Sequence, residues 1–509
     1  MSVRAKSADT IVTALAADRL GVPSVVYFVL SAAAPLTVVA GVVTTGYAVT
    51  GITGLPVAFL AVGAVLALFS VGYVAMARNM VNAGAFYAYI ARGLGRPFGV
   101  AGAWIALVAY NALQVGLYGA LGAAASPLLD KWFGIRPSWW LIALVAWALI
   151  AVLGVMRVEV NGTILAFLLT AEVLVILLFD ATDLVNPAGG DIATTALSPG
   201  ELFVPGVGAL LVIAVLGFVG FESSVVFSEE SRDPRRTVPA ATFLAVAIIA
   251  VLYAVSSWAM TVATGPGKIV DVTRHDGPET VFNLAGAHLS GTVVDIARVL
   301  FVTSLFAAMI SFHNTTARYI FALGRERVLP AVFGRTSVRS GAPKSGSLAQ
   351  TALGCTVIVV YAALGLDPLV QLFFYGGTFG GFGVLLLITA TSVSVIAFFA
   401  RRPGEENAWR RIVAPIGATV ALAIIVYLAV ANFATLLGVA PTSPLRWLLP
   451  AAYVVAAVVG LGWALVLRTT QPDVYAKIGL GAEAATGQAT PAAFGPTGAV
   501  PRHARTRTR

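Results

Sequence analysis

The sequence predicts an all-α membrane protein of twelve transmembrane helices: a 5+5 inverted repeat with broken helices 1 and 6, plus two additional helices. Of its 509 residues, 59% are hydrophobic and 11% are charged, and the mean hydropathy is +0.90. A soluble chain of this length would carry about twice that charged fraction. Apolar windows of about 20 residues, the length that crosses a bilayer, start near Val25, Leu55, Phe98, Trp139, Thr163, Phe203, Ala240, Val293, Ser347, Leu369, Ile412 and Leu445.

The sixth window is interrupted at its centre. The apolar run from Phe203 to Phe227 contains the sequence GFVGFESS at residues 217–224. Glycine weakens a helix and a carboxylate in lipid is costly, whereas non-helical backbone at membrane depth is tolerated where it lines a wet cavity. The window therefore predicts a broken helix whose exposed amides and carbonyls bind a solute, as in a transporter.

The first window carries a second disturbance, SAAAPLTVVAG at residues 31–41, with Pro35 at mid-membrane. Proline removes a helical hydrogen bond and clashes with the preceding turn. Each disturbed window opens a block of five, so the second block enters from the opposite side of the membrane. Kinking or close helix packing explains either break alone, but two breaks in register predict a binding site.

The two breaks are expected to present opposite partial charges. Amides at the start of a half-helix attract a carboxylate, and carbonyls at the end of a half-helix attract an ammonium. We expect the first break to hold the carboxylate of a zwitterion and the sixth to hold its ammonium, with Phe218 and Phe221 closing over the ligand. The predicted substrate-binding residues are Ala33, Ala34, Pro35, Leu36, Thr37, Leu216, Phe218, Val219, Gly220 and Phe221.

Three titratable side chains in the predicted spans are candidates for gating or proton coupling. Glu222 is a gate, a proton site or an ammonium partner, or else it pairs with a polar group across the bundle. Glu172 is a proton carrier, or else it satisfies a hydroxyl near a helix edge. His313 titrates near physiological pH, although a lone histidine near a helix end is more often structural. No metal site is expected.

Basic residues are distributed unevenly over the predicted topology. The chain has 32 Lys and Arg residues. If both termini lie inside, only six of them fall outside: Lys131, Arg136, Lys268, Arg274, Arg298 and Arg446. This is the positive-inside bias, so the net charge of +9 indicates topology rather than nucleic-acid binding. The loop at 180–201 has acids and no Lys or Arg, as an external loop should. With Cys355 as its single cysteine, the chain forms no intrachain disulfide.

We expect four regions along the chain. These are a cytoplasmic N-terminal arm at 1–22, a ten-helix transporter core at 23–400, helices 11 and 12 at 401–468, and a disordered basic cytoplasmic tail at 469–509. The arm lacks the pattern of a cleavable signal peptide. The tail cannot bury a core; its arginines contact lipid head groups, or it is simply solvated. The expected location is the plasma (inner) membrane, with both termini cytoplasmic.

A loop of mixed charge follows the sixth window and is a candidate lock. Salt bridges from such a loop hold one conformation of an alternating-access cycle. The charged residues of the loop are Glu229, Glu230, Arg232, Asp233, Arg235 and Arg236, and their candidate partners after the eighth window are Arg318, Arg325, Glu326 and Arg327.

Three ordered motifs resemble those of the amino acid–polyamine–organocation (APC) permeases. They are GFE at 220–222 followed by EExxDPxRxxP at 229–239, NAGAFYAY at 82–89 with GLG at 93–95, and RYIFALGR at 318–325 running to LP at 329–330. The resemblance implies a LeuT-type fold and secondary uptake or exchange of amino acids or related amines. It also places Phe312 near a position where some relatives have a gating aromatic.

Two departures from that family leave the coupling ion open. The first break is AAPLT at 33–37 rather than a Gly-x-Gly type sequence, and the fifth window has no lysine, which some relatives use as a coupling cation. Glu172 is the acid inside that window. We expect proton-coupled symport or exchange; the alternatives are Na⁺ coupling through Thr303 or Ser304, or a polyamine transporter of the same fold.

Other classes of function find little support in the sequence. It has no Cys/His metal cluster and no HExxH helix, and TGPGK at 264–268 lacks the P-loop spacing. We therefore expect no enzyme activity and no cofactor, and a small-molecule substrate, a coupling ion (H⁺ or Na⁺) and membrane lipid as partners. A channel or a non-transporting sensor would keep both breaks but would not accumulate a solute.

Overall fold

The computed structural model describes Leu15 and residues 19–80, 82–156, 158–337, 340–402, 404 and 406–481. Regular structure in these ranges is helical, apart from one isolated parallel bridge between Leu20 and Ser231. Most of the predicted N-terminal arm and most of the predicted tail lie outside the described residues.

Eleven helices within the described ranges are long and apolar enough to cross a membrane. Two of them, Val22–Thr50 and Val207–Val225, are interrupted by residues that are not helical. The others are α4 (Leu55–Asn79), α6 (Arg96–Phe133), α8 (Val158–Val185), α10 (Pro234–Thr264), α13 (Gly291–Arg325), α14 (Lys344–Ala363), η7 with α15 (Pro368–Phe374 and Tyr375–Arg401), η8 with α16 (Trp409–Val413 and Ala414–Ala431) and α18 (Leu445–Thr470).

The remaining predicted window forms α7 (Trp139–Leu153), which is apolar but only 15 residues long. Short helices connect the long ones: α5 (Ala85–Gly93), η2 (Thr195–Leu197), η3 (Pro199–Phe203), η5 (Ser228–Glu230), α11 (Ile269–Asp276), α12 (Glu279–Gly286), η6 (Ala331–Gly334), α17 (Phe433–Leu436) and α19 (Pro472–Lys477). All twelve predicted apolar segments are therefore helical, eleven of them long enough to span a membrane, and the predicted all-α membrane fold is confirmed.

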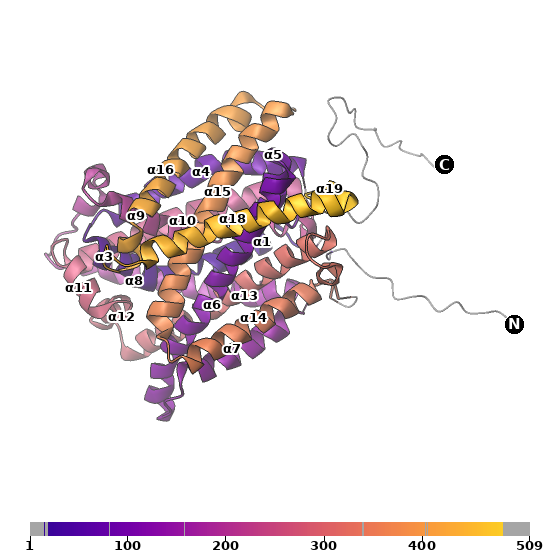
Figure 1. The fold of residues 1–509 in the computed structure, drawn as a ribbon. Coiled ribbons are helices and arrows are strands. Elements are labelled where there is room, and N and C mark those ends of the chain that lie inside the picture. Colours follow the sequence, from indigo (N-terminus) through magenta and orange to yellow (C-terminus); the bar gives the residue numbers. More distant parts are fainter. Residues whose placement is uncertain are drawn as a thin grey trace, which may run out of the picture.

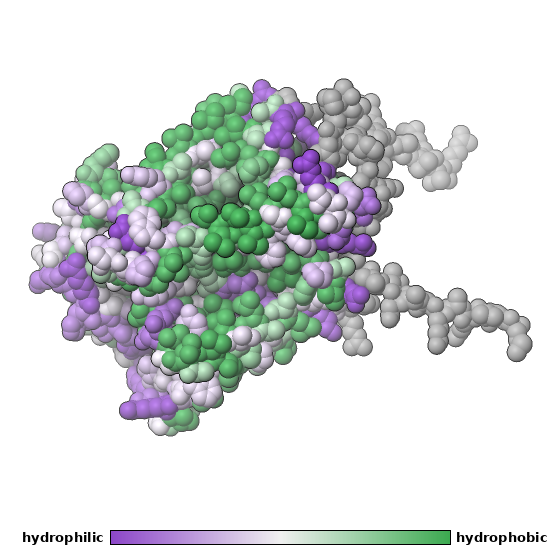
Figure 2. Space-filling view, in the orientation of Figure 1, coloured by the Kyte–Doolittle hydropathy of each residue, from purple (hydrophilic) through white to green (hydrophobic). Residues whose placement is uncertain are grey.

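The outer surface has the character of a lipid-facing protein. Large apolar side chains are exposed on it, among them Phe167 at 75% and Leu448 at 61%. Figure 2 shows hydrophobic residues over the middle of the molecule and hydrophilic residues gathered toward the left and right ends. Apolar patches of this extent on a chain of long apolar helices mark contact with a bilayer.

The first predicted break is present. It separates α1 (Val22–Ala33) from α2 (Pro35–Thr37), which continues through a π-helical turn, η1 (Val38–Val43), into α3 (Thr44–Thr50). Ala34 lies between them with a φ of 46°, a left-handed conformation that an alanine adopts at some cost. Pro35 explains the position of the break, because proline disfavours the helical conformation in the residue before it.

The second predicted break is also present, and it touches the first. α9 (Val207–Phe218) is separated from η4 (Phe221–Val225) by Val219 and by Gly220, whose φ is 114°. A Cβ atom added to Gly220 would lie 2.7 Å from the Cβ of Ala32 and 3.0 Å from the backbone nitrogen of Ala33. Glycine is therefore required here both by the backbone conformation and by the close approach of the two breaks.

The fifth span ends later than the sequence indicates. α8 continues to Val185, so Asp180 and Asp183, which the sequence analysis assigned to an external loop, lie in the helix and are buried. Asp180 accepts a hydrogen bond of 2.8 Å from the hydroxyl of Ser256 on α10. Hydropathy alone ends the span at Phe179, because it counts Asp180 and Asp183 as polar whether or not they face a partner helix.

The molecule has two polar ends, which differ in the segments that they carry. The terminal face carries Leu20, Ser231, Glu326 and Gly481, which meet through the bridge of Leu20 to Ser231 and a hydrogen bond of Gly481 to Glu326. The opposite face carries α11 and α12. In Figure 1, α5 and α19 of the terminal face lie toward the right, and α3, α11 and α12 lie toward the left.

Candidate substrate site between the broken helices

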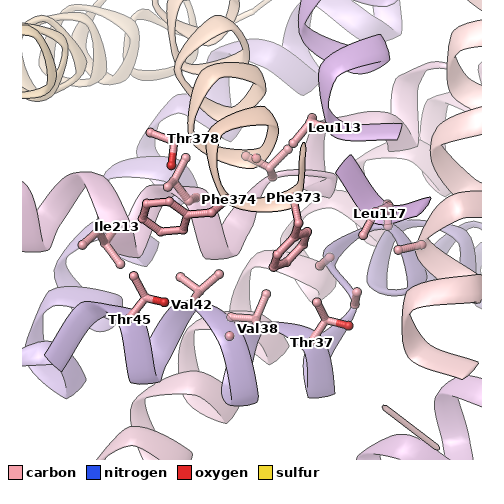
Figure 3. Close-up of a pocket in the computed structure, with 18 of the residues that line it drawn as sticks. Thr37, Val38, Val42, Thr45, Leu113, Leu117, Ile213, Phe373, Phe374 and Thr378 are labelled. Carbon is pink, nitrogen blue, oxygen red and sulfur yellow. The ribbon is translucent and has the colours of Figure 1, made fainter. Parts of the chain in front are cut away.

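A cavity of about 120 Å³ lies between the two breaks. Its walls come from both broken helices and from α6, α13, η7, α15 and α17. The lining residues are Ala32, Ala33, Ala34, Thr37, Val38, Gly41, Val42, Thr45, Leu113, Leu117, Ile213, Leu216, Val219, Ala308, Phe312, Phe373, Phe374, Gly377, Thr378 and Leu436. Figure 3 shows Phe373 and Phe374 above the first broken helix, opposite Val38 and Val42.

Six of the predicted site residues line this cavity: Ala33, Ala34, Thr37, Leu216, Val219 and Phe312. The two phenylalanines expected to close over the ligand pack elsewhere. The ring of Phe218 lies 6.3 Å from that of Phe59, and the ring of Phe221 lies 6.1 Å from that of Phe69, both on α4. These two rings therefore pack the second break against α4.

Glu172 lies at the start of the second half of the first broken helix. Its Oε1 accepts hydrogen bonds from the backbone amide of Leu36 at 2.5 Å and from the hydroxyl of Ser304 at 2.6 Å. The hydroxyl of Ser304 is also 3.1 Å from that of Thr37. A carboxylate of the protein thus occupies the end of a half-helix that attracts anions, beside Pro35 and next to the cavity.

Glu222 is bonded within its own break. One carboxylate oxygen accepts from the hydroxyl of Tyr110 on α6 at 2.7 Å, and the other accepts from the amide of Gly220 at 2.9 Å. The backbone carbonyl of Glu222 accepts from Tyr73 of α4 at 2.9 Å. Glu222 therefore stabilises the conformation of the second break and does not line the cavity.

His313 lies one residue beyond the cavity-lining Phe312 on α13 and joins that helix to α14. Its Nε2 is 2.8 Å from the hydroxyl of Ser347, and the residue is buried. A Cβ atom added to Gly154 would lie 2.3 Å from the same nitrogen, so α7, α13 and α14 meet at this histidine. These contacts favour the structural role for His313 over a role in proton coupling.

The third wall of the cavity was not predicted from the sequence. Phe373 and Phe374 end η7, and Thr378 begins the next turns of α15. The glycine-rich run GGTFGG at 376–381 is the signal that marks this segment, since closely spaced glycines in a span indicate an approach of backbones. On α6, Leu113 and Leu117 line the cavity at the four-residue spacing of one helix face.

A larger cavity of about 720 Å³ connects the site to the opposite face. It shares Thr37, Gly41, Thr45, Phe373 and Phe374 with the smaller cavity. Its outer wall includes Lys131, Glu279 and Arg298. Side chains of these residues are partly exposed, so the cavity reaches the surface.

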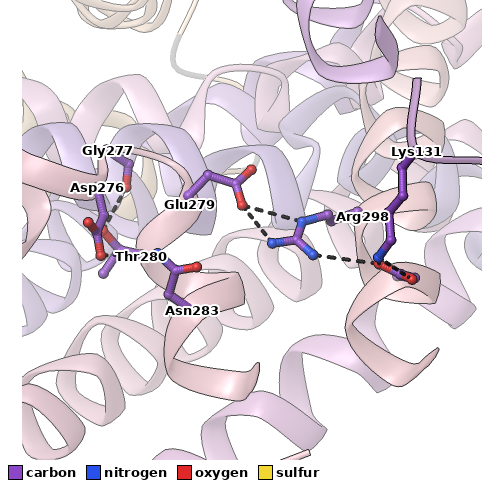
Figure 4. Close-up of polar contacts among 8 residues, drawn as sticks. Lys131, Asp276, Gly277, Glu279, Thr280, Asn283 and Arg298 are labelled. Carbon is purple, nitrogen blue, oxygen red and sulfur yellow. Dashed lines mark hydrogen bonds and ion pairs between the residues drawn. The ribbon is translucent and has the colours of Figure 1, made fainter. Parts of the chain in front are cut away.

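Ion pairs link the helices around this outer opening. Lys131 of α6 contacts Asp295 of α13 at 2.6 Å, and Arg298 of α13 contacts Glu279 of α12 at 2.8 Å. The guanidinium of Arg298 also lies 3.6 Å from Asp295. Figure 4 shows these contacts as one chain from Glu279 through Arg298 to Lys131.

The terminal face is closed by buried ion pairs, which confirms two of the predicted partners. Arg318 contacts Glu230 at 2.6 Å and Arg325 contacts Glu229 at 2.7 Å. The guanidinium of Arg318 also lies 4.7 Å from the centre of the Phe227 ring. Both pairs connect α13 to the mixed-charge loop after the second break.

Aromatic side chains fill the space between these ion pairs and the cavity. The ring of Tyr110 lies 6.2 Å from Phe312, which lines the cavity, and 5.4 Å from Tyr319, which follows Arg318. All three rings are buried. The site is therefore sealed toward the terminal face and open toward the opposite face.

A bundle of membrane-spanning helices with two touching breaks and a cavity open to one face is an arrangement found in membrane transporters. The chain belongs to the amino acid permease family, whose sequence profile matches residues 20–459. This confirms the resemblance found in the sequence.

Individual relatives differ in the solutes that their names give. The histidine permease HisP of Lactococcus lactis subsp. cremoris is 28% identical over 300 residues, 54% of this chain and 59% of that protein. A probable GABA permease of Pseudomonas aeruginosa is 25% identical over 301 residues, 57% and 61% of the two chains. The low-affinity putrescine importer PlaP of Escherichia coli is 22% identical over 346 residues, 65% and 70%. The chain thus spans less than two thirds of the first two relatives.

Proposed function

We propose that this chain is a secondary active transporter that moves an amino acid or a related amine by alternating access. The observation that carries the proposal is the cavity between the two breaks, which is open to one face and sealed at the other. Val219 ends the first half of the second broken helix and Ala34 precedes the second half of the first. The carbonyl of Val219 suits an ammonium, and the amides of Leu36 and Thr37, which follow Ala34 and Pro35, suit a carboxylate.

We assign the terminal face to the cytoplasm and the chain to the plasma membrane. Of the 32 Lys and Arg residues, the topology with both termini inside leaves only six on the outer side, in agreement with the positive-inside rule. The conformation described is then outward-open, with its cytoplasmic side locked by the pairs Arg318–Glu230 and Arg325–Glu229.

We assign proton coupling to Glu172. As a carboxylate it accepts the amide hydrogen of Leu36, which is the kind of donor that a substrate carboxylate needs. Protonation weakens this hold because a neutral carboxyl is a poorer acceptor than a carboxylate, and the amide becomes available to the substrate. Proton and substrate would therefore bind together, as symport requires. Glu222, by contrast, acts as a positioning residue for the second break.

Uptake by the purified full chain in liposomes tests the proposal. With a panel of amino acids and polyamines outside, we expect uptake driven by an inward proton gradient and abolished by a protonophore. Glu172→Gln should remove the dependence on the proton gradient while leaving equilibrium exchange. Uptake that follows a Na⁺ gradient instead would overturn the assignment of Glu172, and the hydroxyls of Thr37 and Ser304 would become the candidate ligands. Absence of gradient-driven uptake for the whole panel would overturn the proposed function.

A further inference from the structure

The cavity between the two breaks is lined without a charged side chain among the described residues. Its polar side chains are the hydroxyls of Thr37, Thr45 and Thr378, and the rest of its lining is glycine, alanine, branched aliphatic residues and phenylalanine. In Figure 3 the aromatic rings and aliphatic groups face the centre of the cavity from several elements. A ligand side chain in this space is therefore surrounded by apolar groups.

The two acids beside the cavity are already engaged with the protein. Glu222 accepts hydrogen bonds on both carboxylate oxygens, from Tyr110 and Gly220. Glu172 accepts from Leu36 and Ser304. Neither is among the lining residues, so neither offers a charge to a ligand side chain. A second ammonium or an imidazolium entering the cavity would be desolvated without a counter-charge, which is strongly unfavourable.

The volume of the cavity limits the size of a ligand that is held entirely between the two breaks. One water needs roughly 10–15 Å³ of cavity, so a cavity of about 120 Å³ has room for about ten non-hydrogen atoms. That is the size of leucine, isoleucine or methionine in zwitterionic form. Tryptophan or arginine would have to extend past Phe373 and Phe374 into the larger cavity, which shares these two residues, and would leave the apolar enclosure.

We propose that this site selects neutral amino acids with an aliphatic side chain, from valine to methionine in size, and rejects cationic amino acids and polyamines. The inference rests on the proposed function, because it takes the cavity as the transport site. The breaks bind the two charges that all amino acids share, and Leu117, Ile213, Phe312 and Phe373 surround the side chain. The chain would thus differ in substrate from relatives named for histidine and putrescine.

Binding of radiolabelled leucine to the purified full chain tests this selectivity. We expect unlabelled leucine, isoleucine, valine and methionine to compete. Lysine, histidine and putrescine should compete at least about 100-fold less well, since each would bury a polar or charged group without a partner. Saturable binding of lysine or putrescine with no binding of leucine would overturn the inference but leave the transporter proposal intact. Failure of every compound to bind to folded protein would count against the proposed function itself.

A charge placed in the cavity wall gives an independent test. Thr378→Asp puts a carboxylate where the hydroxyl now lines the cavity, and we expect it to lower leucine affinity and raise lysine affinity at least about tenfold relative to wild type. Thr378→Val is the matched control of similar shape, and it should not raise lysine affinity because it adds no charge to the cavity. If both variants fold and Thr378→Asp leaves the order of preference unchanged, the cavity is not the selectivity site. If Thr378→Asp does not fold, the competition series on wild type decides alone.

The size limit has its own variant. Leu117→Ala removes a branched side chain from the wall, and we expect it to admit phenylalanine and tryptophan as competitors while leucine binds more weakly. Wild type that binds tryptophan as well as it binds leucine would overturn the size limit.

Discussion

The two faces of this protein are held by ion pairs of opposite character. On the terminal face, the side chains of Arg318 and Glu230 are 2% and 1% exposed. On the opposite face, the side chains of Lys131 and its partner Asp295 are 54% and 18% exposed, and those of Arg298 and its partner Glu279 are 29% and 55% exposed. Removing one partner of a buried ion pair strongly destabilises the fold, whereas an exposed ion pair contributes little to stability. The difference explains why the cavity is sealed on one side and reaches the surface on the other.

Burial also determines how the two sets of contacts respond to solvent. Salt screens exposed pairs and leaves buried pairs almost unaffected. The terminal pairs are further enclosed by backbone contacts, since the amides of Arg19 and Leu20 donate to the carbonyl of Glu230 at 2.9 and 3.0 Å. We therefore expect the sealed face to open only through a concerted change that separates α13 from the loop after the second break.

The largest effect is expected from removing Arg318. Arg318→Met leaves the carboxylate of Glu230 buried without its partner, which should lower the free energy of unfolding by about 3–5 kcal/mol. The measurement is chemical or thermal unfolding of the purified protein in detergent. The matched control is Arg298→Met on the same helix, at the exposed face, which should cost about 0–1 kcal/mol.

A double variant separates the loss of a pair from the loss of a charge. Arg318→Met combined with Glu230→Met removes both charges, and it should recover most of the stability lost by Arg318→Met alone. No recovery would indicate that Arg318 acts mainly through its stacking on Phe227 and its 3.0 Å hydrogen bond to the carbonyl of Asn314.

The second terminal pair should matter somewhat less. Arg325→Gln removes two hydrogen bonds of 2.7 Å to Glu229, and Glu229 keeps one partner, the amide of Ala83 at 2.9 Å. We expect a loss of about 2–3 kcal/mol together with faster labelling of a cysteine introduced at Thr316, deeper in the same helix. Unchanged labelling would show that this pair does not restrict access from the terminal face.

The same comparison shows what a sequence can and cannot predict. Pro35 and Gly220 act on their own backbones, so both breaks were predicted at the correct positions. The mixed-charge loop predicted ion pairs with the segment after the eighth window, but the choice of Glu230 for Arg318 depends on tertiary packing. Periodicity likewise gave no direction for Glu172 and Glu222, which turn out to bond to backbone amides at the breaks.

The remaining differences have the same physical origin. The third cavity wall at Phe373 and Phe374 comes from a segment about 340 residues from the first break in the chain, and no local pattern places the two together. Asp180 lies in a helix because Ser256 offers it a hydrogen bond, and Ser256 belongs to another helix. Local conformation was therefore predictable from the sequence, while contacts between distant segments were not.

A smaller effect is expected at Glu326, where the chain near α19 docks on the terminal face. Its carboxylate accepts from the amides of Gly479 and Gly481, both at 2.6 Å, and burial raises the pKa of this carboxyl above its usual range. Because the folded state then binds the proton more tightly than the unfolded state, stability is fully present below the ordinary pKa of about 4.3 and is lost as pH rises through the folded pKa.

Glu326→Gln should flatten that pH dependence, because the amide resembles the protonated carboxyl. The measurement is the melting temperature of wild type and variant between pH 4 and pH 8. Glu406→Gln provides the matched control for the loss of a carboxyl, since the side chain of Glu406 is 14% exposed and its partners are Arg78 and Arg410. An identical slope in wild type and Glu326→Gln would exclude Glu326 as its source.

The smallest effect on stability is expected at the opposite face, where it is accompanied by an effect on transport. Glu279→Gln breaks the contact to Arg298 and should change the free energy of unfolding by about 0–1 kcal/mol. Since the pair stands at the wall of the outer cavity, its loss should alter the apparent KM for substrate at low salt and have no effect at high salt, where the pair is already screened. A salt-independent change in KM would mean that Glu279 contacts the substrate or shapes the cavity directly. The ion pairs of the opposite face would then resemble those of the terminal face in being insensitive to salt, despite their exposure.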